Sequence, residues 1–295
     1  MTQGIIPQLE ELLAYRHYAE QLDWFKPSQV SSANSGNMRS HLRGRGMDFA
    51  EVRRYQFGDD IRLIHWPLSA RSGKIYTKVY HEERERAIYL VIDQSLSMQF
   101  ATRVAFKNVI AARLGALLGW SALNYQQQVG GIIFNDTHLH YVKPRRSRQA
   151  LLELFHGLTS TDYNYPHGGL TASLGFLLPQ ISSGSIVIII SDFNQLDPII
   201  TQQISYLSHQ AQVINLLIYD PLEAQLPNFN QVNFSDRLAQ RFLKLNVNRQ
   251  IQQQYAQIHL NRQQALASLS KQQHMHYLNI ATNDDLLLKL QQGVN

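Results

Sequence analysis

The chain has 295 residues, of which 44% are hydrophobic and 17% are charged, and its formal net charge is +5. This apolar content is sufficient for a sizeable core, so the composition excludes an intrinsically disordered protein. The absence of cysteine excludes a disulfide scaffold, a thiolate zinc site and a cysteine nucleophile. The apolar runs are far shorter than the roughly 20 residues that cross a bilayer. We therefore expect a cytoplasmic protein with no membrane span and no secretory signal.

The positive charge is concentrated in one segment of the chain. Residues 31–80 contain nine Lys and Arg against four Asp and Glu, which accounts for the whole formal excess. Such a stripe can attract nucleic acid. No known nucleic-acid motif accompanies it, and the aromatic residues nearby do not interleave in a stacking pattern. Nucleic-acid binding through this segment is therefore kept only as a second alternative.

The first 86 residues are predicted to form an N-terminal helix followed by a basic, β-rich segment. Apolar residues at helical spacing predict an amphipathic helix within residues 7–24. The Ser-, Asn- and Gly-rich residues 28–46 are typical of a loop. Residues 47–86 predict short extended stretches broken by turns, and the alternation over residues 74–80 indicates a strand.

From residue 87 onward, predicted strands and helices alternate. The strands are expected at 87–92, 129–134, 138–142, 186–190, 213–219 and 275–280. Helices are expected at 104–120, 147–158, 171–180, 198–209 and 284–291, with a long polar helix in the Gln-rich stretch that ends at residue 273. Because parallel strands need crossover helices that bury both sheet faces, this alternation predicts a doubly wound, mostly parallel α/β sheet over residues 87–295.

Two of the predicted strands run directly into polar residues. The strand at 87–92 is followed by Asp93, with Ser95 and Ser97 at every second position after it. The strand at 186–190 is followed by Ser191 and Asp192. Carboxylates and hydroxyls are hard oxygen donors, which Mg²⁺, Mn²⁺ and Ca²⁺ prefer. The alternative interpretation is that Asp93 only caps the following helix and that the serines fill a turn.

These residues resemble the metal-ion-dependent adhesion site of von Willebrand factor A domains, in which D-x-S-x-S precedes a Thr loop and a later strand-end Asp. Upstream and downstream motifs are similar to the domain-of-unknown-function 58 family. They are Gly44–Phe49, Arg53–Arg62, Trp66–Arg71, Lys78 to Glu83, Asp93–Met98, Lys107 and Asp220–Glu223. The resemblance extends in order from about residue 30 to residue 230.

The resemblance implies a von Willebrand factor A-like fold and a metal-dependent protein-interaction module. It implies a divalent cation, Mg²⁺ or another such as Mn²⁺ or Ca²⁺, held by Asp93, Ser95, Ser97, Thr171 and Asp192. It also implies a protein partner: a MoxR-type AAA+ ATPase, an acidic ligand of its client, or both. The module would then act as an adaptor in assembling or remodelling another complex.

The sequence does not favour an enzyme. It contains neither a G-x-S-x-G elbow nor a G-x-x-x-x-G-K-[ST] loop. A metal-dependent phosphoesterase that uses the same strand-end pocket is the first alternative. Such an enzyme needs a general base beside the metal, and the obvious candidates, Asp93 and Asp192, are already assigned as ligands.

Overall fold

The computed structural model describes residues 4–26, 47–82, 86–160, 165–166, 168–194, 196–227, 232–236, 241–245 and 248–293. The chain forms two compact units. The larger unit combines Met1–Pro27 with Arg86–Asn295, and the smaller unit contains Ser28–Glu85.

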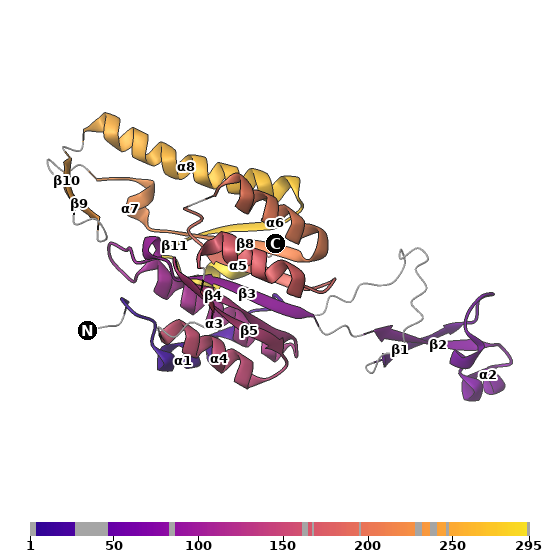
Figure 1. The fold of residues 1–295 in the computed structure, drawn as a ribbon. Coiled ribbons are helices and arrows are strands. Elements are labelled where there is room, and N and C mark those ends of the chain that lie inside the picture. Colours follow the sequence, from indigo (N-terminus) through magenta and orange to yellow (C-terminus); the bar gives the residue numbers. More distant parts are fainter. Residues whose placement is uncertain are drawn as a thin grey trace. The chain divides into compact units, whose positions relative to one another are not determined.

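A seven-stranded sheet forms the centre of the larger unit (Figure 1). Its strands are β3 (Ala87–Asp93), β4 (Gln128–Phe134), β5 (His138–Arg145), β6 (Tyr165–Pro166), β7 (Ile186–Ser191), β8 (Gln212–Tyr219) and β11 (His276–Ala281). Their order in space is β11-β8-β7-β3-β4-β5-β6. Neighbours from β11 to β4 are parallel, whereas β5 pairs antiparallel with both β4 and β6. The structure confirms the doubly wound, mostly parallel sheet that the sequence predicts.

Helices cover both faces of this sheet (Figure 1). One core contains side chains from α1 (Leu9–Ala19), α3 (Lys107–Asn124), α4 (Arg148–Thr159) and α9 (Leu286–Gln292). The core on the other face contains side chains from α5 (Gly169–Leu177), α6 (Pro198–Gln210) and α8 (Arg249–Gln272). Successive residues of β3 divide between the two cores, with Leu90 in the first and Val91 in the second. The unbroken apolar run in β3 therefore reflects burial on both faces of the strand.

The segment between β8 and β11 contains more structure than the predicted long polar helix. That helix is present as α8, which begins after Asn248, whose side chain accepts a hydrogen bond from the N–H of Ile251 at 2.8 Å. Before it lie α7 (Pro221–Ala224) and an antiparallel hairpin of β9 (Val232–Asp236) and β10 (Arg241–Leu245). The remaining short elements of the larger unit are the 3₁₀ turns η2 (Leu96–Met98) and η3 (Leu178–Gln180). Within the described ranges, no helix combines the length and apolar character needed to cross a membrane.

The smaller unit is built on an antiparallel pair of strands, β1 (Met47–Arg54) and β2 (Tyr76–Glu82). The 3₁₀ turn η1 (Ile61–Leu63) and the helix α2 (Trp66–Ser72) lie between them in sequence. We expected only extended stretches and turns here, so α2 corrects that prediction. Three local features explain the helix: His65 Nδ1 accepts a hydrogen bond from the N–H of Leu68, Pro67 occupies the first turn, and Gly73 ends the helix with a φ of 68°.

Helix α1 belongs to the larger unit, although we grouped it with the basic segment as residues 1–86. Leu12 and Leu22 are buried in the core. The indole Nε1 of Trp120 donates a hydrogen bond to the carbonyl of Leu12 at 3.0 Å, and the hydroxyl of Ser121 donates one to the carbonyl of Leu22 at 2.7 Å. The apolar face of α1 is thus covered by α3, and the smaller unit contains residues 28–85 alone.

Candidate functional site

The candidate site lies where the strand order of the sheet reverses. From β3, the chain continues to β4 on one side, and the next parallel strand, β7, pairs with β3 on the other side. In open α/β sheets, ligands bind at this switch point, outside the carboxyl ends of the strands. Strand β3 ends at Asp93, and β7 ends at Ser191, which Asp192 follows.

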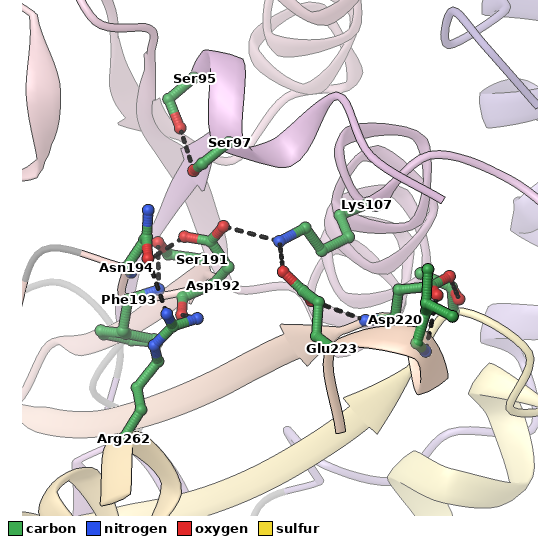
Figure 2. A network of polar contacts seen from close by, with 12 residues as sticks. Ser95, Ser97, Lys107, Ser191, Asp192, Phe193, Asn194, Asp220, Glu223 and Arg262 are labelled. Atoms are coloured by element: carbon green, nitrogen blue, oxygen red, sulfur yellow. Dashed lines mark hydrogen bonds and ion pairs between the residues drawn. The ribbon is translucent and has the colours of Figure 1, made fainter. Parts of the chain in front are cut away.

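Asp93 organises the turn after β3. One of its carboxylate oxygens accepts a hydrogen bond from the N–H of Ser95 at 2.8 Å, and the other accepts one from the hydroxyl of Ser191 at 2.6 Å. The hydroxyl oxygens of Ser95 and Ser97 lie 3.2 Å apart and share a hydrogen bond (Figure 2). The D-x-S-x-S motif is therefore folded so that its three polar side chains gather at the end of β3.

Asp93 and Asp192 are two buried carboxylates, and the charge of Asp192 acts on Asp93. Their exposed fractions are 4% and 2%. Burial first, and the charge of Asp192 second, raise the pKa of Asp93 to about 6, although hydrogen bonds from Ser191 and Ser95 lower it. Buried negative charges in such proximity are costly unless a cation or a proton compensates them.

A buried lysine supplies part of this compensation. Lys107, the first residue of α3, has a side chain that is 1% exposed. Its Nζ lies 2.8 Å from Oδ2 of Asp192 and 2.7 Å from Oε1 of Glu223 (Figure 2). Burial alone would lower the pKa of Lys107, but these two carboxylates raise it above its ordinary value, so the ammonium is charged. The cluster of Asp93, Asp192, Glu223 and Lys107 still carries a net negative charge.

Glu223 is held in place by the start of α7. Its second carboxylate oxygen accepts a hydrogen bond from the N–H of Asp220 at 2.8 Å, which completes a capping box. Asp220, in turn, accepts hydrogen bonds from the N–H and hydroxyl of Thr102, from the N–H of Leu222 and from the hydroxyl of Thr282. Burial alone would raise the pKa of Asp220, but these hydrogen bonds hold it below its ordinary value.

Helix α8 contacts the loop that follows β7. The guanidinium of Arg262 donates a hydrogen bond to Oδ1 of Asn194 at 2.7 Å and a longer one, of 3.5 Å, to the carbonyl of Asp192 (Figure 2). The N–H of Asn194 donates to Oδ1 of Asp192 at 3.0 Å. Phe193 between them has a φ of 48°, an uncommon conformation for a residue with a side chain. Arg262 therefore fixes the backbone of the loop and leaves the Asp192 carboxylate to Lys107 and Asn194.

Thr171, the fifth predicted ligand, lies in the first turn of α5. The N–H of Gly169, which starts this helix, donates a hydrogen bond to the carbonyl of Asn135 at the end of β4, so α5 begins at the same edge of the sheet. Among the described residues, no hydrogen bond joins the Thr171 hydroxyl to Asp93, Ser95, Ser97 or Asp192. The structure thus gathers the first four predicted ligands and brings the fifth to the same edge.

The donors at this edge fit a hard divalent cation. They are carboxylate and hydroxyl oxygens, the ligands of Mg²⁺, and their charge is only partly neutralised by Lys107. Within the described part of the chain, no three His, Asp or Glu side chains are grouped so as to hold a metal ion. A cation bound here would therefore rely on the serine hydroxyls and on water in addition to two carboxylates.

Sequence reasoning assigned no role at this site to Ser191, Lys107, Glu223 or Arg262. Ser191 immediately precedes the predicted ligand Asp192, and this position in the sequence is the signal that could have indicated its role. Lys107 and Glu223 belong to motifs of the family resemblance but lie 116 residues apart, so their contact depends on the fold. Arg262 comes from the Gln-rich stretch, whose composition indicates no chemistry.

The chain is similar to several solved structures at low sequence identity. The conserved hypothetical protein BatB from Bacteroides thetaiotaomicron is 14% identical, with a TM-score of 0.45 over 71% of this chain and 97% of that one. An aerotolerance-related membrane protein from Bacteroides fragilis is 16% identical, with a TM-score of 0.44 over 71% and 98%. A von Willebrand factor type A protein from Catenulispora acidiphila is 11% identical, with a TM-score of 0.37 over 74% and 43%.

Sequence relatives are also found. Uncharacterized proteins from Mycobacterium bovis and Mycobacterium tuberculosis are 26% identical over 202 residues, which is 66% of this chain and 62% of each relative. The match therefore spans less than two thirds of these relatives. The family model described as "Protein of unknown function DUF58" matches residues 51–265, which include β3, β7, the D-x-S-x-S turn and Glu223. The chain belongs to the DUF58 family.

Proposed function

We propose that this chain is a metal-dependent protein-interaction module that binds its partner at the carboxyl edge of β3 and β7. The observation that carries the proposal is the pair of buried carboxylates, Asp93 and Asp192, at the switch point of the sheet. Ser95 and Ser97 add hydroxyl oxygens beside them. In this proposal these four residues hold Mg²⁺, or a similar divalent cation, together with Thr171.

A bound divalent cation would supply a positive centre with an open coordination position. An acidic side chain of a partner protein matches both the charge and the oxygen preference of such a centre. The proposed partner is a MoxR-type AAA+ ATPase or an acidic segment of its client, as the family resemblance implies.

A binding role fits the described carboxylates better than a catalytic one. Both oxygens of Asp93 and both oxygens of Asp192 already accept hydrogen bonds. Glu223 is held likewise by Lys107 and by the N–H of Asp220. A general base must reach the proton that it removes, and this proposal uses Asp93 and Asp192 as metal ligands, while Glu223 is paired with the Lys107 ammonium. The proposal therefore assigns no catalytic residue.

The test measures binding of the full chain to a purified MoxR-type ATPase of the same organism, in Mg²⁺ and in excess chelator. We expect binding in Mg²⁺, its loss in chelator, and its loss in Asp93→Ala. The control is Asp197→Asn, which changes an exposed carboxylate that caps α6, the helix that follows β7, and should leave binding intact. Equal binding in chelator would refute the metal dependence. Mg²⁺-dependent hydrolysis of p-nitrophenyl phosphate that Asp93→Ala abolishes would favour the phosphoesterase instead.

A further inference from the structure

The ammonium of Lys107 already occupies part of the environment that a metal ion at Asp192 would use. The Lys107 side chain is almost completely buried, and its Nζ lies 2.8 Å from Oδ2 of Asp192 (Figure 2). The other oxygen of Asp192 accepts a hydrogen bond from the N–H of Asn194 at 3.0 Å. Without any metal, Asp192 therefore has a cationic partner that is covalently part of the chain.

Two cations that share one buried carboxylate repel each other. Coulomb energies grow as the surroundings exclude water, and screening by salt is weak for buried pairs. A divalent ion bound through Asp192 would therefore destabilise an ammonium that remained in contact with the same carboxylate. Any binding of such an ion must displace Lys107 from Asp192 or tolerate this repulsion.

The structure offers Lys107 a second acceptor. Oε1 of Glu223 lies 2.7 Å from Nζ, and Oε2 of the same carboxylate is fixed by the N–H of Asp220. Because α7 holds Glu223 in place, the ammonium can keep one ion pair while its contact with Asp192 weakens. Without the Glu223 charge, Asp192 would be the remaining carboxylate partner of the ammonium among the described residues.

We propose that Lys107 is an internal cation that competes with a divalent metal ion for Asp192, and that Glu223 reduces this competition by attracting the ammonium. The inference rests on the proposed function in one respect, namely that Asp192 is a metal ligand. It makes Lys107 a positioning residue that sets the affinity of the site. It also explains how the metal-free protein tolerates a carboxylate as buried as Asp192.

The test is a titration of the full chain with Mn²⁺ alone. Binding is measured by calorimetry and by the electron paramagnetic resonance signal of free Mn²⁺. Lys107→Met removes the competitor at similar side-chain volume and should tighten Mn²⁺ binding about tenfold or more. Glu223→Gln leaves the ammonium on Asp192 and should weaken binding about threefold or more. The two substitutions thus shift the affinity in opposite directions.

Two further variants separate competition for the carboxylate from a general effect of charge. Arg262→Gln removes a cation that contacts the carbonyl of Asp192 but not its carboxylate. Arg113→Met removes a cation from α3 that pairs with Glu11 at 2.7 Å, away from Asp192. Neither should tighten Mn²⁺ binding as Lys107→Met does, although Arg262→Gln, which frees the loop after β7, can weaken it. An equal gain in Arg262→Gln or Arg113→Met would overturn the inference.

Unchanged or weaker binding in Lys107→Met, or unchanged or tighter binding in Glu223→Gln, also overturns it. If Lys107→Met does not fold, the Mn²⁺ affinity of Glu223→Gln alone tests the inference, and unchanged or tighter binding overturns it. If neither the wild type nor any variant binds Mn²⁺ at millimolar concentration, the proposed metal site fails and the inference fails with it. Measurable binding in the wild type with no difference among the variants leaves the metal site standing and removes only the role of Lys107.

Discussion

The hydroxyl of Ser191 donates a hydrogen bond of 2.6 Å to Asp93, a residue 98 positions earlier in the chain. This bond joins the last residue of β7 to the last residue of β3, the two strands between which the strand order reverses. The same hydroxyl accepts a hydrogen bond from the N–H of Phe193 at 3.0 Å. Ser191 therefore orients both the Asp93 carboxylate and the loop that carries Asp192.

Ser191→Ala should lower the free energy of unfolding by about 1–2 kcal/mol, because a buried carboxylate loses a donor. Urea unfolding measures this loss. The matched control is Ser121→Ala, which removes another buried hydroxyl, bonded to the carbonyl of Leu22 at 2.7 Å on a different face of the unit. Both variants should lose similar stability, but only Ser191→Ala should also weaken Mg²⁺ binding. An equal effect of both variants on Mg²⁺ affinity would contradict the orienting role of Ser191.

Asp93→Asn is expected to stabilise the metal-free protein by about 1 kcal/mol, because it removes a buried charge beside Asp192 at nearly constant volume. In saturating Mg²⁺ the order should reverse, since the wild type gains stability from ion binding and the variant does not. Urea unfolding curves in chelator and in Mg²⁺ show whether the order of the two free energies of unfolding reverses. A variant that is less stable than the wild type in chelator would refute this account of the site.

Thr171→Val tests the fifth proposed ligand. The hydroxyl makes no hydrogen bond within the described ranges to the other four proposed ligands, so the substitution should leave stability within about 0.5 kcal/mol of the wild type. Mg²⁺ affinity, measured by calorimetry, should fall severalfold. Thr201→Val in α6, whose hydroxyl donates a hydrogen bond to the carbonyl of the N-cap residue Asp197, should leave the affinity unchanged. Wild-type affinity in Thr171→Val would limit the site to Asp93, Ser95, Ser97 and Asp192.

Asp220→Asn should alter the acid limb of the stability curve. The pKa of Asp220 is held below its ordinary value, so its contribution is present above about pH 4 and is lost as the pH falls through the lowered pKa. The variant should be less stable by about 1–3 kcal/mol at neutral pH and should depend less on pH below about 4. Thr282→Val, which removes one of the donors to Asp220, should give an intermediate acid limb. Identical acid limbs in all three proteins would show that Asp220 does not contribute in this way.

The sequence predicts the central sheet well because its strands carry strong local signals. Strands buried on both faces, such as β3 and β7, need continuous apolar runs, and these runs are directly visible. The residues that end these strands are visible for the same reason, so Asp93 and Asp192 can be found without a structure. Their closeness follows from the rule that parallel strands end at a common edge.

The partners of these residues are not predictable in the same way. Lys107, at the start of α3, reaches Asp192, and Glu223, in α7, reaches Lys107. No local pattern sets the register of those contacts. The short helix α2 depends on a histidine side chain acting as its N-cap, which common capping preferences do not anticipate. The assignment of α1 to the larger unit depends on hydrogen bonds that Trp120 and Ser121 donate to the carbonyls of Leu12 and Leu22, more than 90 positions away in sequence.

The way in which α1 is held changes how the chain can be divided. The indole of Trp24 donates to the carbonyl of Leu290, and the Gln291 side chain donates to the carbonyl of Gln21, so residues near the two ends of the chain meet. The smaller unit is consequently an insertion between two segments of the larger unit. After a single proteolytic cleavage within it, we expect the two resulting fragments to stay associated through the contacts of α1. Removing residues 1–85 would strip Leu12 from the core and uncover Trp120, whereas replacing residues 28–85 by a flexible Gly/Ser linker would delete the smaller unit and keep the residues of the core.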